Sequence, residues 1–146
     1  MNLVFAPSVY ALIISGIALT VCLISDIRSR TIYPIVCFAL FAAASFESGK
    51  DYANSVIIAL LGFLPMLAAA KFGNGGGGDA LLIAALGYTL PSLFSLYLYL
   101  FSSLFYLIVL IIAIRRTGDR KKQLPYVPFV FAAWVVLVLF FLTGVM

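Results

Sequence analysis

The sequence contains no histidine and little charge of either sign. Lys and Arg together number 9 and Asp and Glu 5, so 10% of the 146 residues are charged, against about 25% in soluble domains. Without histidine, Ser–His and Cys–His catalysis, zinc proteases of the HExxH type and His-ligated redox centres are excluded. The few acidic residues therefore become the main candidates for chemistry.

Two cysteines, Cys22 and Cys37, both lie inside apolar segments. They leave three interpretations: a disulfide, part of a metal site, or packing. Free cysteine commonly behaves as a small buried hydrophobe, and the sequence offers no histidine or second cysteine pair to complete a metal site. We therefore expect both thiols to serve packing, and we predict no metal and no cofactor.

Long apolar stretches dominate the sequence, which is 65% hydrophobic with a mean hydropathy of +1.21. A soluble fold of this size cannot bury so much apolar surface. The stretches predict an all-α fold, a polytopic membrane helix bundle of about six transmembrane helices that forms a single domain over the whole chain. The first stretch lacks the basic region that opens a cleavable signal peptide. The predicted spans are residues 7–25, 32–46, 54–70, 80–90, 92–114 and 126–145.

Basic residues are distributed unevenly among the predicted loops. The loops after the first, third and fifth spans hold eight of the nine Lys and Arg residues, and the alternate loops hold only Lys50. Cytoplasmic loops are enriched in these residues, so we expect both termini on the non-cytoplasmic side of the cell inner membrane. Basic clusters beside spans also contact anionic membrane lipid. The net charge of +4 therefore needs no nucleic-acid partner, and we predict none.

Two of the five acidic residues, Asp26 and Asp79, adjoin long apolar stretches. The loop assignment puts both at the same membrane face, where carboxylates at a hydrophobic boundary are costly and tend to be functional. When two carboxylates lie close together, repulsion and burial raise the pKa of one of them. The protonated member can then polarise a peptide carbonyl while the ionised member activates a water. Three structural interpretations stay open: each aspartate caps a helix, each sits in the membrane interface, or Asp26 pairs with Arg28 or Arg30.

A run of glycines precedes the second of these aspartates. Residues 73–79 read Gly-Asn-Gly-Gly-Gly-Gly-Asp. Glycine permits close approach of another chain, so the run can present backbone groups to an extended substrate, in the manner of β-strand addition. A flexible linker is the alternative. A phosphate-binding loop is disfavoured because no Gly-Lys-Ser/Thr follows.

Three segments together resemble the prepilin peptidases, also called type IV leader peptidases. The segment Asp26-Ile-Arg-Ser-Arg-Thr-Ile32 is similar to the family's first catalytic motif, and Gly76-Gly-Gly78-Asp79 followed by Ala-Leu-Leu-Ile-Ala-Ala-Leu-Gly87 is similar to its Gly-x-Gly-Asp motif. Leu124-Pro-Tyr-Val-Pro128 resembles the segment that opens the last span. The chain departs from the family pattern at Tyr33-Pro34 in place of Pro-Asn, and at Leu81 in place of a frequent lysine.

The resemblance implies an aspartic endopeptidase that removes the short basic leader from pilin-like precursor proteins at the cytoplasmic membrane face. By matching position, Asp26 and Asp79 are the catalytic pair, and Gly76 and Gly78 support the second aspartate. Family members with a methyltransferase region carry four further cysteines. The chain resembles the small peptidase-only form of tight-adherence (Flp) pilus systems, so we expect no methyltransferase activity.

Other interpretations remain open from the sequence. The two aspartates could bind protons or cations in a transporter subunit, and the departures at Tyr33-Pro34 and Leu81 would also fit a non-catalytic membrane assembly factor. Small residues such as Gly16 allow close helix packing within the chain or in a homo-oligomer. The basic cluster at residues 115–122 would repel a basic leader, so we expect it to point toward lipid, or the leader to bind elsewhere.

Overall fold

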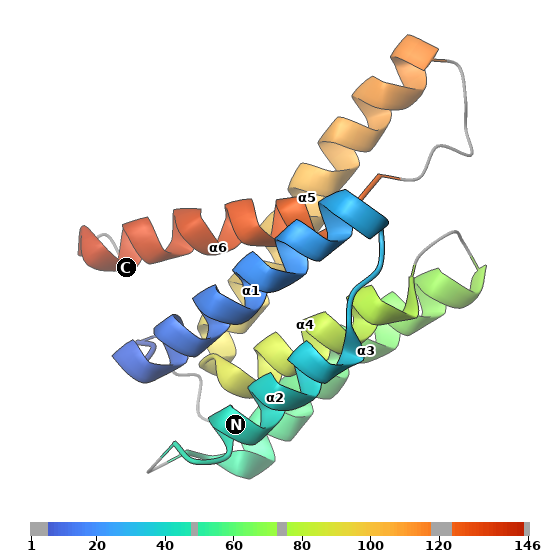
Figure 1. The fold of residues 1–146 in the computed structure, drawn as a ribbon. Coiled ribbons are helices and arrows are strands. Elements are labelled where there is room, and N and C mark those ends of the chain that lie inside the picture. The colour runs from blue at the N-terminus through green and yellow to red at the C-terminus, as the bar shows by residue number, and fades with distance from the viewer. Residues whose placement is uncertain (1–5, 48–49, 73–75, 118–123, 145–146) are drawn as a thin grey trace.

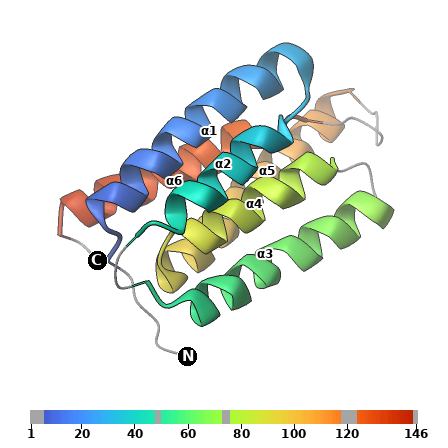
Figure 2. The same ribbon diagram turned by 60° about the horizontal axis from the view of Figure 1, so that its bottom comes forward.

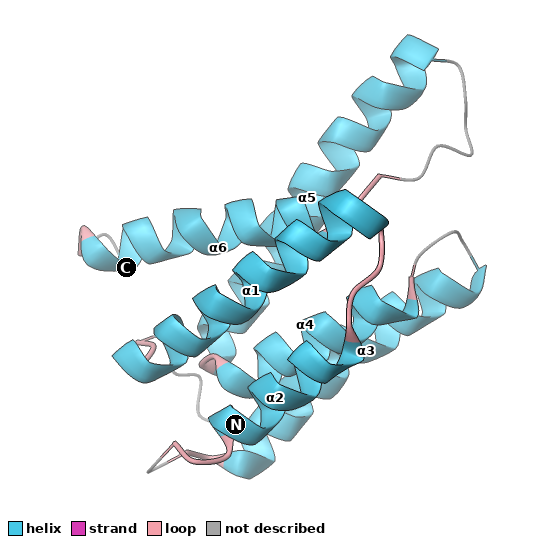
Figure 3. Ribbon diagram, in the orientation of Figure 1, coloured by secondary structure: helices cyan, strands magenta, loops and turns pink. Residues whose placement is uncertain are grey.

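The computed structural model describes residues 6–47, 50–72, 76–117 and 124–144, and within them the chain is helical without any strand (Figure 3). The predicted all-α fold is therefore confirmed, with one helix at each predicted span. These helices are α1 (Val9–Ser29), α2 (Pro34–Ala44), α3 (Tyr52–Phe72), α4 (Gly77–Thr89), α5 (Ser92–Thr117) and α6 (Val127–Leu142).

Two helix ends differ from the predicted spans in a way that matters for the site. Helix α1 continues past residue 25 to Ser29, so Asp26 lies in its last turn, and α4 begins at Gly77 rather than residue 80, so Asp79 lies in its first turn. Apolar runs locate spans but do not mark the polar turns that extend a helix beyond the hydrocarbon region.

Helix starts follow ordinary capping chemistry. The Ser8 hydroxyl oxygen accepts a hydrogen bond from the Ala11 N–H (3.0 Å) at the start of α1, and Asp51 Oδ1 accepts one from the Asn54 N–H (3.1 Å) at the start of α3. Pro34 opens α2 at a position where a missing N–H is harmless. The departure Tyr33-Pro34 is therefore compatible with a helix start.

In the described part of the chain, three helices are long and apolar enough to cross a membrane: Val9–Ser29, Tyr52–Lys71 and Ser92–Arg116. The other three have 11, 13 and 16 residues. At about 1.5 Å per residue they measure about 16, 20 and 24 Å, which is short of a hydrocarbon core of about 30 Å.

Helix α4 forms the centre of the bundle. It contacts α1, α2, α3 and α5, and Figure 2 shows it between α2 and α3. Eight of its 13 residues are buried, as expected for a helix that is apolar on all sides. A carboxylate in the first turn of this helix is therefore held by the core of the fold.

Tyr99 of α5 fixes α4 against α3. Its hydroxyl donates to the Ile83 carbonyl oxygen (3.1 Å). A Cβ added at Gly62 would lie 2.6 Å from the Tyr99 ring, and one at Gly87 would collide with the Tyr99 hydroxyl. The glycines at 62 and 87 therefore make room for a large side chain between the two helices.

Successive helices run in opposite directions, so α1, α3 and α5 end where α2, α4 and α6 begin (Figure 1). We call this the carboxylate end, because Asp26 and Asp79 lie there. The opposite end, formed by Ser8, residues 44–47 and 50–51, and residues 89–92, is the distal end. Arg28, Arg30, Lys71, Arg115 and Arg116 belong to the carboxylate end and Lys50 to the distal end. The membrane orientation inferred from this asymmetry stays a prediction.

Candidate active site

The last turn of α1 returns the chain toward the bundle. Arg30 has left-handed backbone (φ 51°, ψ 32°), and its N–H donates to the Asp26 carbonyl oxygen (3.0 Å). The Ser25 hydroxyl donates to the Thr31 carbonyl oxygen (2.9 Å). These bonds hold residues 30–32 beside the side chain of Asp26.

Asp26 joins the first helix to the last. Its side chain is 5% exposed, and Oδ2 accepts a hydrogen bond from the Val127 N–H (3.2 Å) at the first residue of α6. The N–H groups at a helix start have no partner within the helix. The Asp26 carboxylate supplies one, across 101 residues of sequence.

Asp79 lies in the first turn of α4 with Gly76 as the N-cap residue. The Asp79 carboxylate accepts a hydrogen bond from the Gly76 N–H, and the Asp79 N–H donates to the Gly76 carbonyl oxygen (3.1 Å). The first of these bonds is the one that an acidic residue at the third helical position makes in a capping box, whereas Gly76 has no side chain to make the reciprocal bond. A Cβ at Gly78 would lie 3.0 Å from Ile32 Cβ, so glycine there lets the residue 30–32 segment approach Asp79.

The predicted role of the glycine run can be compared with the structure only at Gly76, Gly77 and Gly78. Gly76 is extended (φ −85°, ψ 138°), whereas Gly77 and Gly78 are already helical. Residues 73–75, on which most of the predicted extended contact with substrate depends, lie outside the described residues. The support of Asp79 by Gly76 and Gly78 thus has a local basis in capping and close approach.

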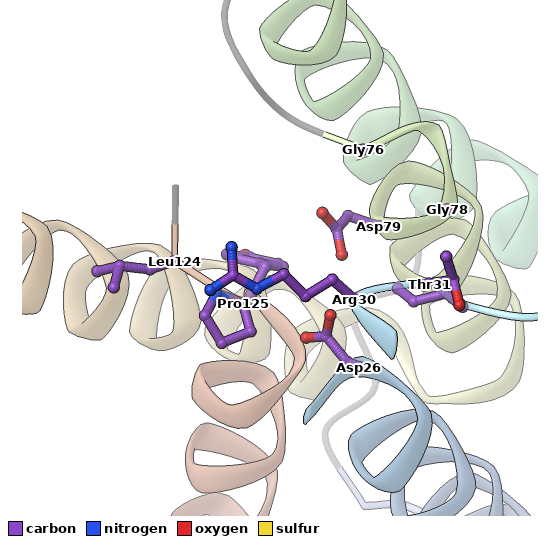
Figure 4. Close-up of a pocket in the computed structure, with 10 residues that line it drawn as sticks. Asp26, Arg30, Thr31, Gly76, Gly78, Asp79, Leu124 and Pro125 are labelled. Atoms are coloured by element: carbon purple, nitrogen blue, oxygen red, sulfur yellow. The ribbon is translucent and has the colours of Figure 1, made fainter. Parts of the chain in front are cut away.

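Both carboxylates face one pocket with a volume of about 440 Å³. Figure 4 shows Asp26 from α1 and Asp79 from α4 pointing toward one another. The remaining lining residues come from all three segments that resemble leader-peptidase motifs: Arg30, Thr31, Ile32, Gly76, Gly78, Leu124, Pro125 and Tyr126. Segments that are about 50 residues apart in sequence therefore build one site.

The chain belongs to the type IV leader peptidase family. The model of that family matches residues 13–114, which is most of the chain and includes both aspartates. No curated protein and no solved structure gives a significant match. Family membership and the apolar helices together indicate a membrane peptidase.

In this leader peptidase family member, the pocket makes ionisation of Asp79 costly while Asp26 is charged. Burial and, to a smaller extent, the negative charge of Asp26 raise the pKa of Asp79, which lies ahead of the apolar stretch 80–90, to about 6, while the Gly76 N–H opposes the shift. The Asp26 carboxylate accepts a hydrogen bond from the Val127 N–H and lies near the charge of Arg30. The N-termini of α4 and α6 both point at the site and stabilise one negative charge there.

Two of the structural interpretations of the aspartates, capping and an ion pair, can now be compared with this site. Capping is real, because each carboxylate accepts a hydrogen bond from a backbone N–H at a helix start. An ion pair of Asp26 with Arg28 or Arg30 is not formed, since in the described part of the chain the only ion pair within 4.0 Å joins Lys50 and Glu47. Capping uses only part of each carboxylate, so both remain available to a substrate in the pocket.

The two cysteines lie in the hydrophobic core and serve packing. Cys22 and Cys37 are free and buried, on α1 and α2, and both belong to the hydrophobic core. The interpretation as packing residues is confirmed. Among the residues whose positions are described, no group of three His, Cys, Asp or Glu side chains could hold a metal ion.

Sequence reasoning missed two groups in this peptidase pocket. Arg30 was interpreted only as an orientation signal or an ion-pair partner, yet it lines the pocket. Tyr126 was part of a motif but not a predicted site residue; it is 7% exposed, and its hydroxyl bonds the Ser102 hydroxyl (3.0 Å) on α5. The third motif carried the signal, because residues 124–126 all line the site.

Proposed function

We propose that the chain is an aspartic-type endopeptidase in which Asp26 and Asp79 activate a water molecule. Its substrates are pilin-like precursors with a short basic leader, cut at the cytoplasmic face of the inner membrane, in which the enzyme is a multi-pass protein. The observation that carries this proposal is the shared pocket, into which α1 and α4 each direct one carboxylate. The substrate class comes from the family.

The reaction needs one protonated and one ionised carboxyl group. The protonated carboxyl donates its proton to the scissile carbonyl oxygen, while the ionised one takes a proton from the water that attacks the carbonyl carbon. Collapse of the resulting diol breaks the C–N bond, passes the proton from water to the leaving nitrogen, and returns a hydroxyl proton to the other carboxyl. No cofactor enters this scheme.

The substrate reaches the pocket from the carboxylate end. A helical peptide bond is internally hydrogen-bonded, so the residues around the scissile bond must unwind before they contact the aspartates. The basic leader meets two carboxylates and one arginine in the pocket. The exposed Arg115 and Arg116 lie at the tip of α5, which projects beyond the other helices (Figure 1), and they do not line the pocket.

A proton or cation transporter fits the arrangement less well. Such proteins place ionisable groups along a path near the bilayer midplane. Here the acidic side chains that the structure describes lie at the two ends: Asp26 and Asp79 at one, Glu47 and Asp51 at the other. Between the ends, buried apolar side chains such as Leu19, Leu86 and Phe94 fill the core.

Separate replacement of the two aspartates tests the proposal. Asp26→Asn and Asp79→Asn each keep an oxygen that can accept the capping hydrogen bond, so the fold should persist. Each should lower cleavage of a pilin-like precursor by about 100- to 10,000-fold, the usual contribution of a catalytic acid or base. Cleavage is measured in membranes by the mobility shift of the precursor, and folding by circular dichroism.

The matched control is Asp51→Asn at the distal end. Asp51 also caps a helix but lies outside the carboxylate pocket, so this variant should cleave at the wild-type rate. Wild-type activity in either Asp26→Asn or Asp79→Asn would rule out the pair as the catalytic machinery.

A further inference from the structure

Arg30 is the one basic residue among the described residues that line the carboxylate pocket. It follows Asp26 by four residues, and residues four apart lie on the same face of a helix. Figure 4 shows its side chain crossing the pocket toward Pro125, with Asp26 on one side and Asp79 on the other. Within the described residues, the guanidinium forms no ion pair with a carboxylate at 4.0 Å or less. The proposed reaction does not use this charge.

The backbone around Arg30 fixes where its side chain starts. Residue 30 is the C-cap of α1 and has left-handed backbone, and its N–H is bonded to the Asp26 carbonyl oxygen (3.0 Å). The next residue is held twice. Its carbonyl oxygen accepts a hydrogen bond from the Ser25 hydroxyl (2.9 Å), and the hydroxyls of Ser29 and Thr31 bond each other (2.7 Å). The stem of Arg30 is therefore fixed at the edge of the pocket.

Arg28 offers a comparison within the same turn of α1. Residues two apart in a helix point in nearly opposite directions. Arg28 follows Asp26 by two residues, is exposed, and does not line the pocket. The two arginines thus share a side chain and a helix end, and they differ in whether that side chain reaches the pocket.

The charges that line the pocket balance one another when the carboxylate pair is ready to react. One carboxyl is then protonated, so Asp26 and Asp79 together carry a single negative charge. Arg30 carries one positive charge, because a guanidinium in a protein does not lose its proton. The other described lining residues are uncharged. A basic residue of the leader therefore gains no net attraction in the pocket, and it meets a like charge there.

We propose that Arg30 is a specificity-determining residue, which excludes basic side chains from the leader positions next to the cleaved bond. This inference rests on the proposed function, since it takes the leader from there. At physiological salt, charges interact over about 8 Å, and an extended chain advances about 3.3 Å per residue. Arg30 therefore acts on about the last two leader residues. Uncharged or acidic residues fit there, and the basic residues of the leader lie further from the bond.

Cleavage of matched precursors by the full chain in vesicles tests this assignment. Three precursors carry Lys, Met or Glu at the second residue before the cleaved bond, where Met provides an unbranched, uncharged side chain. Three others carry the same residues at the sixth position before the bond, about 20 Å away. We call the two sets near and far. The wild type should cleave the near-Lys precursor with a kcat/KM about tenfold below that of near-Met, mainly through KM. The far set should be cleaved at equal rates, and equal cleavage of near-Lys and near-Met would overturn the proposal.

Arg30→Gln and Arg28→Gln are the matched variants. Glutamine keeps an unbranched side chain at the left-handed position, so Arg30→Gln should raise the kcat/KM of near-Lys to that of near-Met or above it. Arg28→Gln should keep the tenfold difference, and Arg30→Lys should keep most of it. A loss of activity through misplacement of the aspartates would not change the ratio between two substrates. Unchanged discrimination in Arg30→Gln would therefore contradict the role of its charge.

Salt distinguishes charge from shape without any variant, so it decides the question even where Arg30→Gln is inactive. Raising the ionic strength from about 0.1 to about 1 M shortens the screening length from about 10 to about 3 Å. The preference of the wild type for near-Met over near-Lys should then fall toward equality. A preference that salt leaves intact would mean that lysine is rejected by its shape, and the proposal would fail. If the wild type cleaves none of the six precursors, the proposed function itself fails. If it cleaves them all alike, only the role of Arg30 fails.

Discussion

The pockets at the carboxylate end and the distal end contain similar charges in different surroundings. Each pocket is lined by two acidic side chains and one basic side chain. At the distal end, Lys50 pairs with Glu47 (3.8 Å), and Asp51 is exposed at the start of α3. At the carboxylate end, Asp26 and Asp79 face each other, and neither has an ion partner within 4.0 Å among the described residues.

The difference lies in what compensates the charge. A carboxylate that is ion-paired or exposed does not destabilise the fold, because its charge is balanced or solvated. Two carboxylates directed at one another in a half-buried pocket oppose folding and persist where chemistry requires them. The number of acidic residues therefore says little, whereas their mutual orientation distinguishes a site from an ordinary helix end.

Among changes that leave both carboxylates in place, Gly78→Ala is expected to have the largest effect on cleavage. Its Cβ would lie 3.0 Å from Ile32 Cβ, which is tighter than ordinary van der Waals contact, so we expect the first turn of α4 to move away from residues 30–32 and to displace Asp79. A displacement of about 1 Å in a catalytic group can lower the rate about 100-fold. Precursor cleavage by Gly78→Ala should fall by about that factor, with helical content unchanged by circular dichroism.

Gly77→Ala is the control for this substitution. A Cβ at Gly77 meets nothing within 4 Å, and alanine there changes the same helical turn by the same single methyl group. It should leave cleavage within about twofold of wild type. If both alanine variants lose activity equally, flexibility of the glycine run rather than the approach to Ile32 controls Asp79.

A rise in pH should lower the rate of cleavage by a smaller factor. Because burial and the charge of Asp26 raise the pKa of Asp79 to about 6, the protonated member of the pair is lost above that value. The kcat/KM should then fall by about tenfold for each further pH unit. A pH–rate profile that stays flat from pH 6 to 8 would contradict a proton shared between the two aspartates.

The same shift predicts how folding stability depends on pH. The folded pKa of Asp79 lies above its ordinary value of 3.8, so the folded state binds the proton more tightly. Its contribution is fully present below pH 3.8 and is lost as the pH rises through about 6. Asp79→Asn should flatten the pH dependence of the melting temperature in this window, whereas Asp51→Asn, which leaves Asp79 in place, should keep it.

The catalytic candidates were accessible from the sequence because charge is so scarce in it. An aspartate at the edge of an apolar stretch is conspicuous, and the distribution of basic residues put Asp26 and Asp79 at one face. Their partners were not accessible. The Val127 N–H that binds Asp26 is a backbone group without a side-chain signature, and its contact joins residues 101 positions apart.

The burial of one charge cluster is not evident from the sequence. Of Glu47, Lys50 and Asp51, only Asp51 is exposed. The side chain of Lys50 is only 6% exposed and that of Glu47 19%. Lys50 also lies over the Tyr88 ring, 4.4 Å from its centroid. Burial of a long charged side chain depends on which helices meet around it, and local sequence does not specify that.

Lys50→Met gives the smallest expected effect on cleavage and the sharpest test of independence between the two ends. The substitution removes the ion pair with Glu47 and the hydrogen bond from Lys50 to the Ala44 carbonyl oxygen (3.3 Å), so it should lower the unfolding free energy by about 1–2 kcal/mol. Because the apolar core separates Lys50 from Asp26 and Asp79, kcat/KM should stay at the wild-type value. Adding Glu47→Gln should recover part of the stability, since no unpaired carboxylate then remains. Loss of cleavage in folded Lys50→Met would show that the distal charges act on the carboxylate pair, and the two ends would have to be treated as one site.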